Sequence, residues 1–418
     1  MRKIRTLLER YDRVIWIRFV GEFITGISGA MLAPFLILYL HEVFNGSVMI
    51  PMLVVSLQPF TEMLVTFLAG PYTDRVGRKI AINGSLFLQG AAMIGFVFAD
   101  SVWMIAILYA LNGAGRAIYI PASRAQIADQ TSEDMRSEVF AVISAIGSFG
   151  MTIGPAAGLI LYKSSPSLLF LLEGSALLIY FALCAAFMTE TAPLNTGGNV
   201  KGSGIIPASA IRRPLSFYLP LIGFMLLSMP ISLFYAQMET TYRLFSQDMF
   251  KDGVFALTLM SIAKAVFSLF VEIPLVKWSS KFTMRKIIGI SYVCFALAAV
   301  GLGFSSTYIM LITTVLILTI GESIGLNHFL SFVGRMAPED RRGTFFAIYG
   351  THWDLSRTIS PAIGGLIMLH AGGGLIFLGA GALLLVSLAI QQKIAGIAER
   401  SYLRTVPKNI PDSKRVVV

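Results

Sequence analysis

The stretch of the chain that decides its fold reads Gly70-Pro71-Tyr72-Thr73-Asp74-Arg75-Val76-Gly77-Arg78-Lys79. It lies in a short gap between two long apolar runs, residues 48–69 and 80–99. Charges that stand between apolar runs of this length indicate a turn at a membrane surface. The glycines suit such a turn, because glycine adopts backbone conformations that other residues avoid.

The composition also indicates a membrane protein. Of the 418 residues, 56% are hydrophobic and 13% are charged, whereas a soluble domain carries roughly 25% charged residues. The net charge of +10 does not indicate nucleic-acid binding, because the basic residues stand in short runs between apolar segments. Both cysteines lie inside apolar runs, so we expect neither a disulfide framework nor a metal site, and no cofactor.

Twelve apolar runs are long enough to cross a bilayer, whose roughly 30 Å of hydrocarbon takes about 20 helical residues. The sequence therefore predicts an all-α membrane protein with twelve transmembrane helices. The predicted spans are residues 14–40, 48–69, 80–99, 102–124, 139–162, 167–188, 217–238, 253–276, 287–304, 308–332, 344–369 and 374–392.

The basic residues predict how the spans are oriented. Four of the 33 Lys and Arg residues fall within the spans and three in the alternate gaps that begin after residue 40, which leaves 26 for the other gaps and the termini. Cytoplasmic segments carry the excess of Lys and Arg. We therefore expect a multi-pass protein of the cell (cytoplasmic) membrane with both termini in the cytoplasm.

The longest interior gap divides the predicted spans into two sets of six. It is rich in glycine and polar residues, as flexible linkers are. The predicted organisation is an N-terminal six-helix bundle over residues 1–190, a cytoplasmic linker over residues 191–215, and a C-terminal six-helix bundle with a cytoplasmic tail over residues 216–418.

The two predicted bundles share a weak internal repeat. Pro155 and Pro361 are 206 residues apart, and the same offset relates Gly158 to Gly364. Duplicated six-helix halves are a building plan of secondary transporters, in which the substrate site lies near the middle of the membrane. The repeat therefore predicts two pseudo-symmetric bundles.

Two motifs resemble a known family. The pattern G-x-x-x-D-R-x-G-R-[RK] of residues 70–79 resembles the loop between transmembrane helices 2 and 3 of the major facilitator superfamily. The fifth span resembles the G-x-x-x-G-P-x-x-G-G motif of its drug:proton antiporters, with Leu159 in place of the last glycine. The residues that match this antiporter motif are Gly150, Gly154, Pro155 and Gly158.

The resemblance implies the major facilitator fold, in which two six-helix bundles rock about a central site. It also implies that the charged loop is a conformational gate, with Asp129 at the end of the fourth span as a partner of Asp74. The expected gate residues are Gly70, Asp74, Arg75, Gly77, Arg78, Lys79 and Asp129. The fourth span departs from the antiporter pattern, since Tyr109 stands where an arginine is expected and Arg116 follows two turns later.

Ionisable residues inside the predicted spans mark a candidate cavity. Each costs at least ~2.5–3.5 kcal/mol at the centre of a spanning helix, so it usually faces a cavity or a partner. The candidates for proton coupling and substrate binding are Glu22, Glu62, Arg116 and Glu322. The alternative is a set of structural ion pairs, and Arg18 can pair with Glu22 because the two are four residues apart.

The roles of these candidates are expected to differ. Arg116 and Glu322 are 206 residues apart and so occupy equivalent positions of the repeat. We expect Arg116 to neutralise either Glu22 or Glu322, and we expect Glu322 to carry the proton. Glu173 lies near the outer end of its span and is expected at the membrane interface.

These features predict a monomeric secondary active transporter that couples to protons and expels small amphipathic or drug-like molecules by alternating access. Its expected partners are a small-molecule substrate, protons and the lipid bilayer, with no nucleic acid. Two alternatives remain open: a proton-coupled importer of a small polar solute, and a lipid flippase. An enzyme is not expected, because the spans contain no H-E-x-x-H, Ser-His-Asp or cysteine motif.

Overall fold

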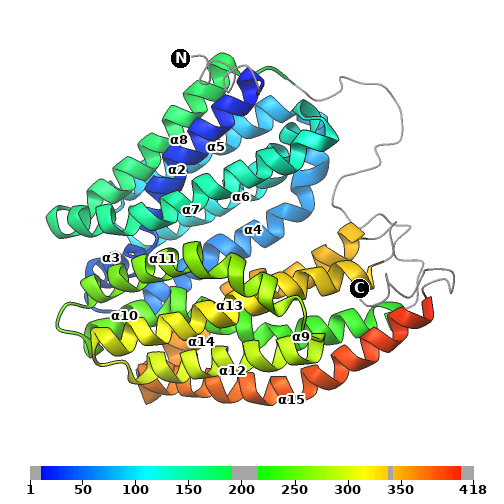
Figure 1. Ribbon diagram of the computed structural model, residues 1–418. Helices are drawn as coiled ribbons and strands as arrows, with labels where there is room; N and C mark the ends of the chain where they lie inside the picture. The colour runs from blue at the N-terminus through cyan, green and yellow to red at the C-terminus, as the bar shows by residue number, and fades with distance from the viewer. Residues whose placement is uncertain (1–10, 191–214, 338–341, 406–418) are drawn as a thin grey trace. The chain divides into compact units, whose positions relative to one another are not determined.

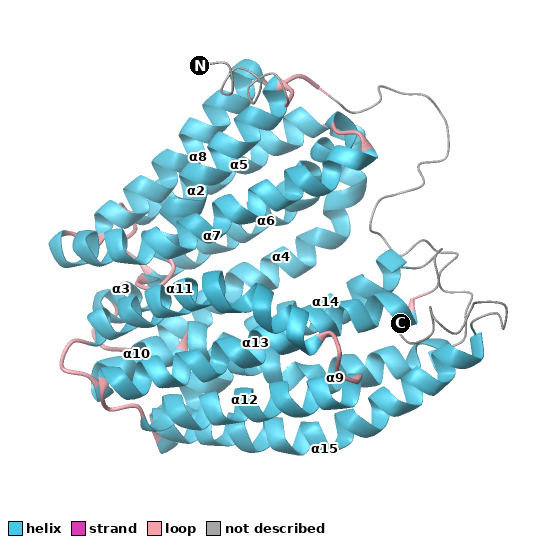
Figure 2. Cartoon of the chain, viewed as in Figure 1, coloured by secondary structure: helices cyan, strands magenta, loops and turns pink. Residues whose placement is uncertain are grey.

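The computed structural model describes residues 11–190, 215–337 and 342–405 (Figure 1). Side chains are described for these residues except 67–75, 133–134, 136–137, 141, 215–216, 342–343 and 397–405. Within this part of the chain every regular element is a helix (Figure 2). The predicted linker falls almost wholly outside the described residues, as does the end of the predicted tail.

Twelve of the described helices have 19 or more residues, and they match the twelve predicted spans one for one. The first predicted span is divided into a long helix, α2, and a short helix, α3 (Leu36–Val43). A second short helix, α10 (Thr241–Met249), precedes α11. The long helices are α2 (Arg13–Leu32), α4 (Met49–Val76), α5 (Arg78–Phe96), α6 (Val102–Gln130), α7 (Glu133–Ser164), α8 (Ser167–Phe187), α9 (Leu215–Glu239), α11 (Gly253–Ser279), α12 (Met284–Phe304), α13 (Tyr308–Met336), α14 (Arg342–Ala371) and α15 (Gly373–Thr405).

Ten helices in the described part of the chain are long and apolar enough to cross a membrane by themselves. The two other long helices, α5 and α14, contain more polar residues, among them Gln89 and His352. Such helices still span a membrane when their polar faces pack against neighbouring helices. The prediction of an all-α, multi-pass membrane protein with twelve long helices is confirmed.

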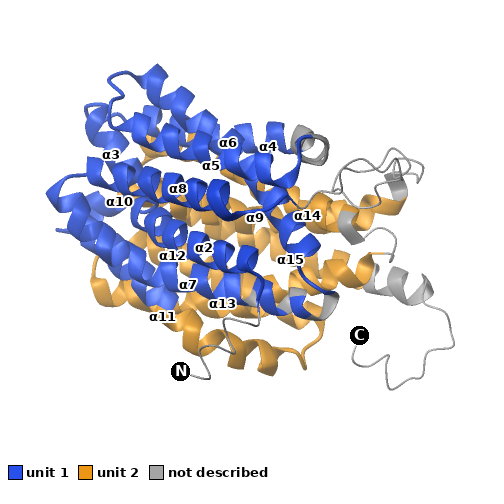
Figure 3. Ribbon diagram, turned by 90° about the horizontal axis from the view of Figure 1, so that it is seen from above, with its two compact units in different colours: residues 1–203, 246–265 blue, residues 204–245, 266–418 orange. Residues whose placement is uncertain are grey.

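The described residues form two compact units (Figure 3). Unit 1 comprises residues 1–203 and 246–265, and unit 2 comprises residues 204–245 and 266–418. In unit 1, α2 packs against α7 and α8, while α5 packs against α6 and α8. In unit 2, α9 packs against α14 and α15, while α12 packs against α13 and α15. The same pairings therefore recur in both units.

The repeat extends to helix caps. The Oγ atom of Ser101 caps α6 by accepting a hydrogen bond from the backbone N–H of Met104, at 3.2 Å. The Oγ1 atom of Thr307 caps α13 in the same way, at 3.3 Å from the backbone N of Met310. Each residue of the second pair lies 206 positions after its counterpart. Such caps satisfy backbone groups that the first turn of a helix leaves unpaired.

Close helix packing also follows the repeat. A Cβ atom on Gly150 of α7 would lie 2.7 Å from the backbone of Gly26 on α2. The residues 206 positions further on are Ser356 of α14 and Ser232 of α9, whose hydroxyls are hydrogen-bonded at 2.7 Å. One contact is made by bare backbone and the other by hydroxyls. Two pseudo-symmetric halves therefore use the same contact positions with different chemistry.

Candidate functional site

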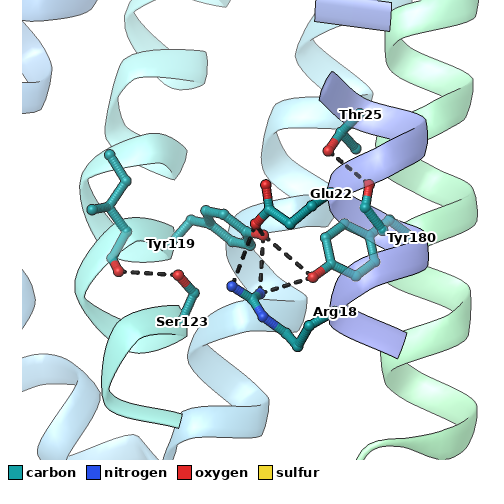
Figure 4. Close-up of polar contacts among 8 residues, drawn as sticks. Arg18, Glu22, Thr25, Tyr119, Ser123 and Tyr180 are labelled. Carbon is teal, nitrogen blue, oxygen red and sulfur yellow. Dashed lines mark hydrogen bonds and ion pairs between the residues drawn. The ribbon is translucent and has the colours of Figure 1, made fainter. Parts of the chain in front are cut away.

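Arg18 is the centre of a buried polar cluster in unit 1 (Figure 4). The side chain is 1% exposed. Its Nη1 atom donates hydrogen bonds to the hydroxyls of Tyr119 on α6, at 3.0 Å, and Tyr180 on α8, at 2.8 Å. Its Nη2 atom lies 3.4 Å from the Oε1 atom of Glu22. Because a buried guanidinium is costly without partners, these oxygens stabilise its charge.

The two tyrosines bind Arg18 through their rings as well as their hydroxyls. The Arg18 guanidinium carbon lies 5.2 Å from the ring centroid of Tyr119 and 6.0 Å from that of Tyr180. Tyr119 also donates a hydrogen bond to the Oε1 atom of Glu22, at 2.8 Å. Gly21 makes room for this arrangement, since a Cβ atom there would collide with the Tyr180 ring. The cluster thereby connects α2, α6 and α8.

A second ion pair lies one turn away on α6. The Nε atom of Arg116 is 3.6 Å from the Oε2 atom of Glu62 on α4, and the two side chains are 46% and 23% exposed. Arg116 and Tyr119 are three residues apart, so they occupy neighbouring positions on one side of the helix. The polar residues thus continue from α4 through α6 to Glu22 on α2.

Three of the four predicted site residues therefore come together in unit 1. The predicted partner of Arg116 was wrong, because its ion-pair partner in the structure is Glu62 rather than Glu22 or Glu322. Sequence spacing cannot show this partner, since it depends on which faces α4 and α6 turn toward each other. The expected pair of Arg18 and Glu22 does form.

Glu322 lies in unit 2, on α13. The hydroxyl of Tyr235 on α9 lies in the neighbourhood of this carboxyl group. Tyr235 is 5% exposed, and its ring packs edge-on against Trp353 of α14, with 5.4 Å between the centroids. Nearby, Arg357 of α14 lies 3.6 Å from Glu239 at the end of α9. A carboxylate beside aromatic rings is an arrangement that can receive a cation.

The charged loop of the signature stretch is ordered around Gly77. This residue has φ 97° and ψ 154°, a region that is essentially restricted to glycine. The carboxylate of Glu190, which follows α8, accepts hydrogen bonds from the backbone N–H groups of Arg78, at 2.8 Å, and Lys79, at 3.1 Å. An anion is favourable there because a helix N-terminus carries partial positive charge. Glu190 therefore caps α5.

The side chain of Arg78 reaches the end of α6. Its Nε atom lies 3.6 Å from the Oδ2 atom of Asp129. We expected Asp129 to be a partner of Asp74, but the side chains of Gly70, Asp74 and Arg75 lie outside the described residues. The gate role of the loop stays a prediction.

The antiporter-like motif packs against α2 within unit 1. A Cβ atom on Gly154 would lie 2.5 Å from the Cβ atom of Ala30, and one on Gly158 would collide with the backbone oxygen of Met31. Pro155 lies inside the helix between them. The motif therefore builds a close contact between two helices of the same unit.

An exposed ion pair joins the end of α7 to the residue before α11. The Nζ atom of Lys163 lies 2.6 Å from the Oδ2 atom of Asp252, and both residues belong to unit 1. Asp252 also accepts a hydrogen bond from the backbone N–H of Phe255. The ammonium group and this N–H hold the pKa of Asp252 below its usual value.

Sequence reasoning missed Tyr119, Tyr180 and Glu190. Tyrosines within a span give little signal, because the hydroxyl shows its role only when its helix faces a buried charge. Glu190 had a weak signal, as an acid directly after the sixth span. Among the residues that the structure describes, no group of three His, Cys, Asp or Glu side chains could hold a metal ion.

Comparison with known proteins gives the chain its family. The model of the Major Facilitator Superfamily matches residues 18–271 and 253–393. A protein of Bacillus subtilis (strain 168) named as an uncharacterized MFS-type transporter, YhjO, is 49% identical over 374 residues, which cover 89% of this chain and 90% of that protein. A protein of Planococcus maritimus named as a Na(+), Li(+), K(+)/H(+) antiporter is 26% identical over 381 residues, covering 85% and 89%.

The fold has close counterparts among solved structures. A POT family transporter in complex with 5-aminolevulinic acid matches with a TM-score of 0.74 at 15% identity, covering 92% of this chain and 96% of that one. The family model and the Bacillus relative both extend over most of the chain. This protein therefore belongs to the major facilitator superfamily.

Proposed function

We propose that this protein is a proton-coupled transporter that expels small amphipathic or drug-like molecules from the cell by alternating access. The observation that carries the proposal is the pair of carboxylates, Glu22 and Glu62, held beside guanidiniums on spanning helices of unit 1. Ionisable residues within a membrane mark substrate paths and proton relays. Glu22 and Glu62 would bind cationic or polar parts of a substrate.

Glu322 is the proposed proton carrier of unit 2. A carboxylate can hold either a proton or a cationic substrate, but not both at once. The Tyr235 hydroxyl lies in the neighbourhood of this carboxyl group, and the Tyr235 ring packs edge-on against Trp353. Aromatic rings attract organic cations. Competition at Glu322 would then exchange an incoming proton for an outgoing substrate.

The glycine motif of α7 supports the antiporter assignment. The contact of α7 with α2 is made by backbone at Gly150 and Gly154. The equivalent contact in unit 2 is made by hydrogen-bonded serines. Small residues let two helices approach closely without side-chain hydrogen bonds. The loop at residues 70–79 would act as the gate of the transport cycle. This loop and both termini would lie on the cytoplasmic side of the membrane.

A drug-susceptibility and dye-efflux panel tests the proposal. Cells that express the protein should tolerate more of a lipophilic cationic compound, and they should lose a cationic dye faster than cells without it. A proton uncoupler should abolish the difference. Efflux that continues at the same rate with the uncoupler would contradict proton coupling. Counterflow in vesicles distinguishes this antiporter from an importer. In an importer, protons and substrate would move in the same direction.

Exchange of monovalent cations for protons is a second candidate. The antiporter name of the Planococcus relative favours it, as do the carboxylates of unit 1, because hard cations prefer oxygen ligands. Vesicles loaded with a pH-sensitive dye distinguish the two functions. Addition of Na⁺, Li⁺ or K⁺ should alkalinise their interior, because the entering cation is exchanged for protons, only if the second candidate is correct.

A further inference from the structure

Glu173, which we expect near the membrane interface, packs with its carboxyl group against α2 of unit 1. Helices α2 and α8 run antiparallel, with Gly21 against Tyr180 and Gly29 against Glu173. A Cβ atom on Gly29 would lie 3.6 Å from the Oε1 atom of Glu173. Glu173 therefore occupies the same face of α8 as Tyr180, two turns further along the contact with α2.

The charges of unit 1 do not balance around Glu173. The cluster on α2, α4, α6 and α8 contains three carboxyl groups and two guanidiniums. Arg18 is paired with Glu22, and Arg116 is paired with Glu62. The Oε2 atom of Glu173 is buried and has no hydrogen-bond partner among the described residues. An ionised carboxylate is unfavourable in such a place, because burial removes the water that stabilises its charge.

Among the described residues, the Ser28 hydroxyl on α2 and the Arg116 guanidinium on α6 are the polar groups in the neighbourhood of the Glu173 carboxyl group. The charged residues of α5, Arg78 and Lys79, stand at its first turn, on the side of Glu190. On α7, Lys163 is paired with Asp252.

We propose that Glu173 is a second proton-binding site of the transporter, and that it exchanges its proton when Arg116 changes carboxylate partner. Arg116 is paired with Glu62 in the structure, and the proposal places a proton on Glu173 in this state. When Arg116 turns to Glu173, the O–H bond of Glu173 breaks and its proton passes to water. Glu62 then loses its cation and is free to bind a proton or a cationic substrate. This role rests on the proposed proton-coupled function.

Infrared difference spectroscopy of the purified full-length protein tests the proposal directly. A protonated carboxyl group has a C=O stretch that disappears when the group ionises. In a Glu322→Gln background, which removes the carboxyl group of the other proposed proton carrier, we expect one such band that is lost on raising the pH, and we expect the addition of Glu173→Gln to remove it. Glu272→Gln is the matched control, because Glu272 is exposed on α11. The band should be unchanged in the control.

A second measurement keeps the test decisive if Glu173→Gln is difficult to purify. Glutamine mimics the neutral acid, so this variant should unfold at the wild-type temperature at low pH. As the pH rises, the wild type should lose stability because Glu173 must ionise in a buried place, whereas Glu173→Gln should lose less. If Glu62→Gln also alters the band of Glu173, the exchange of partners through Arg116 is supported.

The outcomes separate this proposal from the proposed function. A carboxyl band that persists when Glu173→Gln is added to Glu322→Gln would overturn the role of Glu173, whatever the protein transports. A band that is lost in Glu173→Gln, together with substrate transport that moves no protons, would keep the proton on Glu173 but contradict coupling. Loss of both the band and the proton flux in Glu173→Gln supports the two together.

Discussion

The backbone of Gly77 gives a prediction whose size follows from local geometry, and Gly77→Ala is the substitution that tests it. The residue occupies a conformation that costs residues other than glycine about 1–3 kcal/mol. A Cβ atom there would lie 2.5 Å from the Glu190 carboxylate, which must then move away from the start of α5. Loss of a helix cap costs about 1 kcal/mol. We therefore expect the free energy of unfolding to fall by about 2–4 kcal/mol.

Thermal unfolding of the purified protein in detergent measures this change. Glu190→Ala removes only the cap, so it should cost about 1 kcal/mol. Gly84→Ala is the matched control in the same helix, since nothing lies within 4 Å of the added Cβ atom and alanine favours a helix. Its melting temperature should equal or exceed that of the wild type. If Gly77→Ala has the same melting temperature as Gly84→Ala, the reasoning is refuted.

Three further predictions concern packing, the buried cluster and pH. Gly154→Ala should lower the free energy of unfolding by about 1–3 kcal/mol and should also slow transport. Gly147→Ala should do neither, because open space surrounds the added Cβ atom. Unfolding and transport assays of the two variants check this. Arg18→Lys keeps the charge but loses the planar fork, so its melting temperature should fall, and an unchanged value would speak against the cluster. Lys163 lowers the pKa of Asp252, so the stability that this pair contributes is present above about pH 4 and is lost as the pH falls further. As the pH is lowered below about 4, the melting temperature should therefore fall less steeply in Asp252→Asn than in the wild type.

The sequence was sufficient for the twelve long helices and the internal repeat, because hydrophobic length and spacing determine both. It also predicted the pair of Arg18 and Glu22, since that pair lies within one helix. The offset of 206 residues correctly related Pro155 to Pro361. It could not predict that a glycine contact at Gly150 becomes a serine hydrogen bond in unit 2, because the repeat preserves position and not chemistry.

Contacts between helices were beyond the reach of the sequence. The partner of Arg116 depends on the rotation of α4 and α6, and the position of Glu173 depends on which face of α8 packs on α2. Glu190 caps α5 although 112 residues separate it from Arg78. A single sequence contains no signal for such long-range pairs, so the candidate site was predicted residue by residue but not as an arrangement.

Transport by the purified protein in proteoliposomes tests proton coupling most directly. A pH gradient, acidic inside, is imposed on vesicles, and the uptake of a lipophilic cation is recorded together with internal pH. We predict that the wild type concentrates the cation while protons leave, and that Glu322→Gln exchanges the cation downhill but no longer concentrates it. Substrate uptake without proton movement, or Glu322→Gln that concentrates the cation as the wild type does, would contradict the proposed mechanism.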